Sequence, residues 1–215
     1  MKLNIDTSNG KQISLDVNDK KLAQEKLQVF TEDEQTQTKG KRKRFVGVLL
    51  IPATPEKIWS VLEDFDVMGD FIPHLEYYKT RHILKKDESG KTSQSLVEGR
   101  LKIPVLTVEY TLLVSFFPDR HRVEWGLVQA DQVEEYKSEG IDIKACTGGL
   151  KDVDGYGFVL PYEDGKKSIY VYAPIVEASI PLPGFAEKMV TKTVTSGYMH
   201  GIRDRVKKLG YFNSQ

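Results

Sequence analysis

The segment that most constrains the fold is residues 45–75. Its apolar run, residues 46–51, predicts a buried strand that Pro52 ends. A short helix is expected to begin directly afterwards, with Thr54 as its N-cap and Pro55 at its first helical position. A second short turn follows, and the chain then becomes rich in strand-forming residues. A buried strand, two short helical segments and a long strand meander form an unusual order of elements.

The residues that define this opening match a known pattern: a strand ending in Pro, a helix carrying a Trp, and a Phe-x-Pro turn. They are Ile51-Pro52-Ala53, Pro55-Glu56, Ile58-Trp59, Asp64-Phe65 and Phe71-Ile72-Pro73. In this order they resemble the START and polyketide cyclase-like (SRPBCC) superfamily, over about residues 44–209. The resemblance implies the helix-grip fold, an α+β fold in which a curved antiparallel sheet wraps around a long C-terminal helix, with two short helices after the first core strand.

The domain organisation follows from this match and from the chain length of 215 residues. We expect an N-terminal extension at residues 1–40, consisting of a weak strand, a short helix near residues 18–26 and a polar linker. Residues 41–215 are then the START-like ligand-binding domain. Strands are predicted at residues 76–84, 93–102, 106–117, 121–128, 155–161 and 168–176, and the long helix at residues 185–209. Residues 129–154 are expected to be a long loop, with a strand at 141–146 left open.

Composition excludes several classes of function. The 31 basic and 31 acidic residues balance, so bulk charge favours neither nucleic acid nor an anionic membrane as a partner. The single cysteine, Cys146, excludes an internal disulfide, and no histidine pair has metal-ligand spacing, so neither a metal nor a cofactor is expected. No export signal or membrane span is visible. The default compartment is therefore cytoplasmic, or extracytoplasmic if a signal peptide was removed; the oligomeric state stays open.

Alternating side chains suggest where a ligand would bind. One face of residues 106–117 is apolar, and a stripe of small residues on the C-terminal helix is expected to lie over it. Two glycines in that stripe, Gly197 and Gly201, indicate either close packing or space for a ligand. The resemblance implies a cavity for lipids, sterols, isoprenoid quinones or polyketides. The ligand-binding candidates are Tyr110, Leu112, Phe116, Trp125, Phe158, Phe185, Val190, Val194, Gly197 and Gly201.

Polar candidates for the cavity are His74, Glu98, Arg100 and Tyr172. On residues 93–102, the apolar set that includes Val97 is expected to face inward, because burying an unpaired charge is costly. If the opposite set faces inward, Glu98 and Arg100 could pair and orient a polar head group. No GxSxG elbow or compact acid–base pair is present, so no catalytic residue is assigned.

Two surface features have alternative interpretations. The basic run at residues 39–44 is either a solvated approach to the first core strand or a contact for phosphates and lipid head groups. In the resembling fold the loop at residues 182–185 lies at the cavity mouth, where Leu182 and Phe185 would form a lipid-facing gate and make transient membrane contact.

The function that these features favour is binding or carrying a hydrophobic small molecule without covalent chemistry. One alternative is an enzyme of the polyketide cyclase or dehydratase kind, in which one or two polar groups in the cavity move protons. Another is a protein-interaction module of the same fold. The missing acid–base pair favours binding over catalysis.

Overall fold

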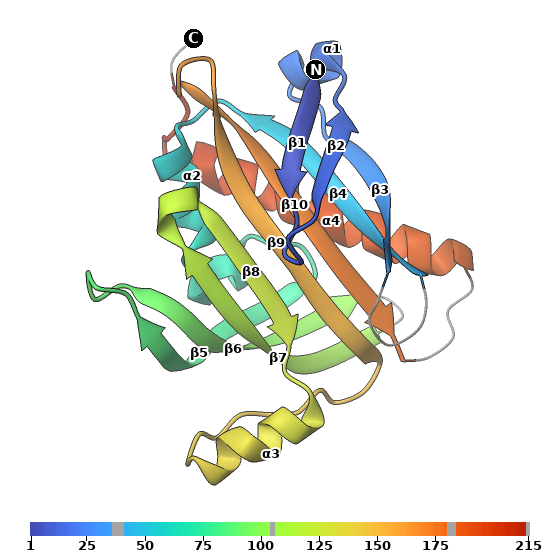
Figure 1. Ribbon diagram of the computed structural model, residues 1–215, viewed down its shortest axis with the longest axis vertical. Coiled ribbons are helices and arrows are strands. Elements are labelled where there is room, and N and C mark those ends of the chain that lie inside the picture. Colours follow the sequence, from blue (N-terminus) through green and yellow to red (C-terminus); the bar gives the residue numbers. More distant parts are fainter. Residues whose placement is uncertain (36–40, 104–105, 180–183, 214–215) are drawn as a thin grey trace.

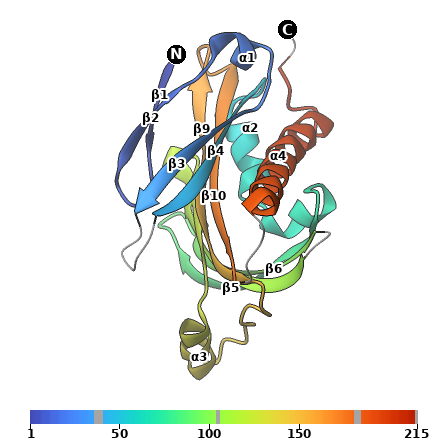
Figure 2. The same cartoon turned by 90° about the vertical axis from the view of Figure 1, so that its right-hand side faces the viewer.

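A curved antiparallel sheet of eight strands organises the chain, as Figures 1 and 2 show. The computed structural model describes residues 1–35, 41–103, 106–179 and 184–213; for residues 34–35, 41–42, 103, 106, 178 and 184–192 it describes the backbone only. The strand order is β3-β4-β10-β9-β8-β7-β6-β5. The strands are β3 (Gln28–Gln35), β4 (Lys41–Ile51), β5 (Leu75–Lys86), β6 (Thr92–Ile103), β7 (Leu106–Phe117), β8 (Arg122–Leu127), β9 (Leu150–Tyr162) and β10 (Lys167–Ala178).

The two faces of this sheet pack against different elements. The inner face holds α4 (Gly184–Lys208), while β1 (Lys2–Asp6), β2 (Gln12–Asp16) and α1 (Asp19–Ala23) lie on the outer face (Figure 2). This arrangement confirms the predicted helix-grip architecture. Among the described residues, no helix combines the length and apolar character needed to cross a bilayer.

The segment that carried the resemblance folds as expected. β4 ends at Ile51, α2 (Pro55–Leu62) starts with Pro at its first position, and the 3-10 helix η1 (Phe65–Asp70) follows. Ile58, Trp59, Val61 and Leu62 are buried in the main core. Residues of α2 and η1 both pack into this core, and the two helices connect β4 to β5 (Figure 1).

The register of β6 and β7 decides which side chains face inward. Val97 pairs with Leu112 and Gly99 pairs with Tyr110, which places this set on the inner face. Glu98 pairs with Thr111 on the opposite, outer face. The expectation that the apolar set faces inward is therefore confirmed.

The region at residues 129–154 differs from the predicted loop. It contains α3 (Ala130–Ser138), residues 141–146 form no strand, and β9 begins as early as Leu150. The helix is charged and Val133 is its buried residue, so its hydrophobic periodicity is weak. Val133 and Ile143 pack with Leu96 on the outer face, which fixes this region against the sheet.

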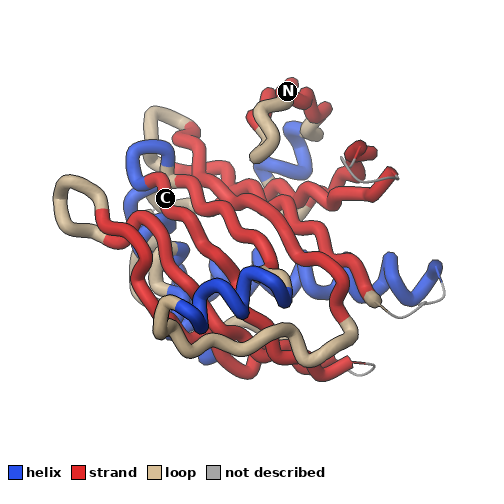
Figure 3. The backbone as a smooth tube through the Cα atoms, turned by 60° about the horizontal axis from the view of Figure 1, so that its bottom comes forward, coloured by secondary structure: helices blue, strands red, loops and turns tan. Residues whose placement is uncertain are grey.

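The helix α4 is rotated relative to the small-residue stripe identified in the sequence. Tyr198, Met199, Ile202 and Val206 are buried in the core, and they are the side chains that contact the sheet side. The prediction was wrong for Gly197 and Gly201, because it ranked small residues above these large apolar ones. Val194 does line the space between α4 and the sheet, and the side chain of Val190 lies outside the described residues. Figures 1 and 3 show that the N-terminal part of α4 extends beyond the edge of the sheet.

Candidate ligand-binding site

A small cavity lies between the inner face of the sheet and α4. We call it the interior cavity; its volume is about 50 Å³. Its walls come from β5 to β10, α4 and the segment after η1, so it is formed only in the folded chain. The lining residues are Ile72, Pro73, Leu75, Tyr78, Leu101, Tyr110, Trp125, Leu150, Val153, Tyr172, Pro174, Val176, Val194 and Tyr198.

Three aromatic rings are stacked along one wall of the interior cavity. Trp125 and Tyr172 are stacked with ring centroids 5.3 Å apart, and Tyr172 and Tyr198 with centroids 4.3 Å apart and planes 7° apart. The stack joins β8, β10 and α4, so it connects the helix to the sheet. Flat aromatic surfaces of this kind form the apolar wall of many small-molecule sites.

Glycines on the inner face make room for these large rings. A Cβ at Gly155 would collide with the Trp125 ring, and one at Gly99 would collide with the Tyr78 ring. A Cβ at Gly47 would likewise collide with the Met199 sulfur of α4. The space that the glycines leave in the sheet is therefore filled by side chains, which explains why the interior cavity is small.

Four tyrosine hydroxyls bring polarity into this apolar interior. The hydroxyls of Tyr78 and Tyr110 are 3.2 Å apart, and the Tyr198 hydroxyl donates to the Met68 sulfur at 3.2 Å. The Tyr172 hydroxyl has no hydrogen-bond partner among the described residues. Burial raises the pKa of the Tyr110, Tyr172 and Tyr198 hydroxyls well above the ordinary value, so they remain protonated.

The structure brings part of the predicted ligand site together. Tyr110, Trp125, Tyr172 and Val194 line the interior cavity. Leu112 and Phe116 lie in the same inner core without lining it. The side chains of Phe185 and Val190, and the loop at residues 180–183 with its predicted gate, lie outside the described residues.

Phe158 was placed on the wrong face. It belongs to the cluster on the outer face beneath the N-terminal hairpin, and the Arg122 guanidinium lies 5.5 Å from its ring centroid. Its pairing with Arg122 of β8 and Val171 of β10 fixes this orientation. The sequence offered no clear signal, because β9 is buried on both faces and both sets of alternating residues look like core.

Glu98 and Arg100 also lie outside the interior cavity. The Glu98 side chain is 2% exposed, accepts hydrogen bonds from Tyr77 at 2.9 Å and Arg81 at 2.7 Å, and lies 3.6 Å from the Lys144 ammonium. Arg100 pairs with Glu76 at 3.0 Å. This ion-pair network belongs to the outer face, so the alternative in which Glu98 and Arg100 face inward and orient a polar head group does not hold.

His74 is exposed and has a positive φ of 69° in the turn before β5. It lines neither the interior cavity nor the larger hollow described next. The turn directs its backbone into β5, since the His74 carbonyl accepts from the Lys102 N–H at 2.8 Å. The predicted role of His74 as a polar cavity residue is therefore not supported by its position.

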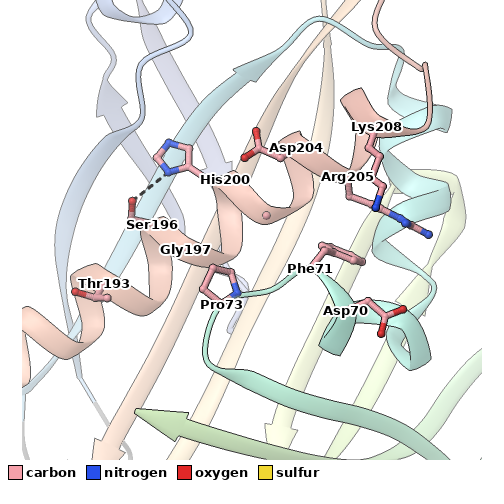
Figure 4. Close-up of a pocket in the computed structure, with 11 residues that line it drawn as sticks. Asp70, Phe71, Pro73, Thr193, Ser196, Gly197, His200, Asp204, Arg205 and Lys208 are labelled. Carbon is pink, nitrogen blue, oxygen red and sulfur yellow. Dashed lines mark hydrogen bonds between the residues drawn. The ribbon is translucent and has the colours of Figure 1, made fainter. Parts of the chain in front are cut away.

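A second hollow, the surface groove, lies between α4 and the segment that contains Asp70, Phe71 and Pro73 (Figure 4). Its volume is about 840 Å³, and it is lined by Asp70, Phe71, Pro73, Thr193, Ser196, Gly197, His200, Gly201, Asp204, Arg205 and Lys208. The Ser196 hydroxyl and the His200 Nδ1 are 3.3 Å apart (Figure 4). Burial, followed by the nearby Arg203 charge, lowers the pKa of His200, which favours the neutral ring.

The glycine pair of α4 faces this groove instead of the interior cavity. A Cβ at Gly201 would lie 2.9 Å from the Phe71 carbonyl oxygen, and one at Gly197 would lie 3.5 Å from the Pro73 ring. The close-packing alternative therefore holds for Gly201, and the glycines pack against the segment after η1. Pro73 lines both hollows, so it separates the groove from the interior cavity.

Several lining residues were missed by the sequence analysis, and the reasons are physical. Tyr78 lies on β5, whose register shifts at three or more points, so strict alternation does not identify its inner face. Tyr198 was missed because the inner face of the helix was inferred from its small residues, Gly197 and Gly201. Leu101 could have been found, because it alternates with Val97 and Gly99 on β6.

The lining limits what the interior cavity can do chemically. Among the described residues that line it there is no carboxylate, histidine, lysine or arginine. The cavity offers apolar contact, ring stacking and hydroxyl groups, which suit binding of a small apolar molecule. None of the described lining side chains has an ordinary pKa near neutral pH, which is the value best suited to general acid–base catalysis.

Comparisons with known proteins support the fold assignment. No protein-family model and no curated protein sequence matches the chain. A STAR-related lipid transfer protein from Xanthomonas axonopodis superposes with a TM-score of 0.60 and 12% identity, covering 84% of this chain and 93% of that one. A START superfamily protein from Mycobacterium smegmatis has a TM-score of 0.57 and 17% identity, covering 77% of this chain and 98% of that one.

The Zhui aromatase/cyclase from Streptomyces sp. R1128 gives a TM-score of 0.57 at 11% identity, covering 77% of this chain and 93% of that one. These identities are low, so the similarity concerns the backbone arrangement and not the site residues. On its architecture and these superpositions, the chain has the START/polyketide cyclase-like helix-grip fold.

Proposed function

We propose that this protein binds or carries a hydrophobic small molecule between the sheet and α4. The observation that carries the proposal is the interior cavity, whose described walls are apolar and aromatic and carry no charged side chain. A solved structure with the same fold is named as a lipid transfer protein and another as an aromatase/cyclase. The described lining favours binding over cyclase chemistry, because it lacks an acid–base pair.

The size of the cavity adds a requirement to this proposal. Typical ligand pockets measure about 300–1,000 Å³, so a cavity of about 50 Å³ must widen to admit a whole ligand. The element to move is α4, because Tyr198 and Val194 form the helix side of the cavity. The N-terminal part of α4 extends beyond the sheet edge (Figures 1 and 3). Outward movement of the helix would enlarge the space in front of the aromatic stack.

Native mass spectrometry of the purified protein, before and after organic extraction, tests the proposal. A bound apolar molecule should add mass that extraction removes, and the stripped protein should then take up N-phenyl-naphthylamine, an uncharged fluorescent probe. Absence of added mass together with no saturable uptake of the probe would contradict the proposal.

Tryptophan fluorescence locates the site. Trp125 lies in the cavity wall and stacks on Tyr172, whereas Trp59 on α2 is outside the lining and its ring centroid lies 6.1 Å from that of His121. We expect Trp125→Phe to lose most of the change in tryptophan emission on probe titration, and Trp59→Phe to retain it. An equal loss in both variants would place the ligand elsewhere.

A further inference from the structure

The polar side-chain groups of the interior cavity are uncharged, and each carries a proton on oxygen or nitrogen. Among the described lining residues they are the hydroxyls of Tyr78, Tyr110, Tyr172 and Tyr198, together with the Trp125 indole N–H. A tyrosine hydroxyl can donate one hydrogen bond and can also accept, whereas an indole N–H can only donate. The described lining therefore offers uncharged groups, each of which carries a proton that it can donate.

Counting protons shows that some of these donors are available. Tyr78 and Tyr110 together carry two hydroxyl protons, and the hydrogen bond between them uses one. The Tyr172 hydroxyl has no hydrogen-bond partner among the described residues, so its proton is available too. The Tyr198 proton is committed to the Met68 sulfur. At least two O–H donors are thus free to reach a ligand.

The same surroundings disfavour an ionised ligand. Burial raises the pKa of Tyr78, Tyr110, Tyr172 and Tyr198, so these groups stay neutral at physiological pH. A carboxylate or ammonium entering the cavity would lose its hydration without meeting an opposite charge among the described lining residues. The charged network around Glu98 lies on the outer face of the sheet.

From these contacts we infer that the ligand is an uncharged apolar molecule with at least one hydrogen-bond acceptor, such as a ketone. Its apolar body lies against the Trp125 and Tyr172 rings of the sheet, and its acceptor receives a hydrogen bond from Tyr172 or from the Tyr78–Tyr110 pair. The inference rests on the proposed function and narrows it to one chemical class of ligand.

Three naphthalene derivatives of similar size test it by calorimetric titration. Acetylnaphthalene is uncharged and carries an acceptor, ethylnaphthalene is uncharged without one, and naphthoate is an anion. We expect acetylnaphthalene to bind roughly 3- to 10-fold more tightly than ethylnaphthalene, as one hydrogen bond provides. Naphthoate should bind roughly 100-fold more weakly than acetylnaphthalene.

Conservative variants identify which tyrosine hydroxyl donates the hydrogen bond to the ligand. Tyr172→Phe and Tyr110→Phe each keep the ring and remove a hydroxyl, so at least one of them should abolish the preference for acetylnaphthalene over ethylnaphthalene. The matched control is Tyr162→Phe, because Tyr162 packs with the cluster on the outer face. This control should leave all three affinities unchanged.

The outcomes separate this inference from the proposed function. If none of the three compounds binds, the proposed function itself fails. If naphthoate binds as tightly as acetylnaphthalene, or if neither tyrosine variant alters the preference for the ketone, the inference about ligand class is overturned while hydrophobic binding stands.

Discussion

The inner and outer faces of the eight-stranded sheet differ most in how they treat charge. On the outer face, Arg44 and Glu98 have side chains that are each 2% exposed, and each is paired with an opposite charge. On the inner face, the described residues around the interior cavity include no charged side chain. A buried charge destabilises the fold unless an opposite charge is held beside it. The two buried charges of the outer face meet this condition, whereas the described lining of the interior cavity contains no charge.

Arg44 provides the largest test of this comparison. Its guanidinium donates to the Ala173 carbonyl at 2.8 Å and to Asp154 at 2.7 Å, and it lies 5.2 Å from the Tyr156 ring centroid. Arg44→Met should lower the free energy of unfolding by about 3 kcal/mol, because it leaves a partly buried Asp154 without this partner. Urea unfolding measures the change. As a control, Lys43→Met at the exposed neighbouring residue should change the free energy of unfolding by less than about 0.5 kcal/mol. If both substitutions changed it equally, Arg44 would behave as a surface residue.

The two glycines of α4 test how tightly the helix closes the inner face. Gly201→Ala should destabilise the fold by about 1–3 kcal/mol, because the new Cβ would lie 2.9 Å from the Phe71 carbonyl oxygen. Gly197→Ala should stabilise it by up to about 1 kcal/mol, since its Cβ meets Pro73 at an ordinary 3.5 Å and alanine is the better helix former. Thermal and urea unfolding of both variants give the comparison. Stabilisation by Gly201→Ala would contradict close packing at this position.

The pH dependence of stability tests whether the buried charge of Glu98 stabilises the outer face. Burial alone would raise the pKa of the Glu98 carboxyl, but hydrogen bonds from Arg81 and Tyr77 outweigh burial and hold the pKa below its ordinary value. A carboxyl with a lowered folded-state pKa stabilises the fold above its unfolded pKa of about 4.3, and this stabilisation is lost as the pH falls through the lower folded value.

We therefore expect Glu98→Gln to lower the free energy of unfolding by about 2 kcal/mol at pH 7 and by progressively less below about pH 4. Urea unfolding across this pH range measures it, and Glu88→Gln in the exposed β5–β6 turn is the control. A difference between wild type and Glu98→Gln that does not vary with pH would show that the charge of Glu98 is not what stabilises the outer face.

The smallest expected effect is on the rate at which a ligand passes from the interior cavity to the surface groove. A Cβ at position 197 would lie 3.5 Å from the Pro73 Cβ, which is within the range for a disulfide. Pro73→Cys with Gly197→Cys, in a Cys146→Ser background, should lock this wall when oxidised. If ligands pass between α4 and the segment after η1, oxidation should slow probe release about tenfold, equivalent to about 1.4 kcal/mol in the barrier.

Stopped-flow release of N-phenyl-naphthylamine, with and without reductant, measures this effect. The Cys146→Ser single variant controls for the oxidant, and reduction should restore the fast rate. Release that is equally fast in the oxidised and reduced double variant would show that ligands leave by another route.

The sequence alone predicted the core strands, the two short helical segments after β4 and the long C-terminal helix, and with them the architecture, but it missed α3. The Pro52 stop, the Trp59 helix and the alternation on β7 are local signals, because strand and helix periodicity depend only on neighbouring residues. Local signals also placed Val97 inward and Glu98 outward, since a lone buried charge is unfavourable. The same reasoning identified Tyr110 and Trp125 on the inner face.

Only the tertiary structure decided the site. The rotation of α4, the outward position of Phe158 and the burial of Arg44 depend on partners far along the chain, such as Asp154 for Arg44. The volume of the interior cavity depends on which rings fill the space above Gly99 and Gly155. Periodicity identifies an apolar face, but packing between distant segments determines what fills it, and that is why the cavity could not be read from the sequence.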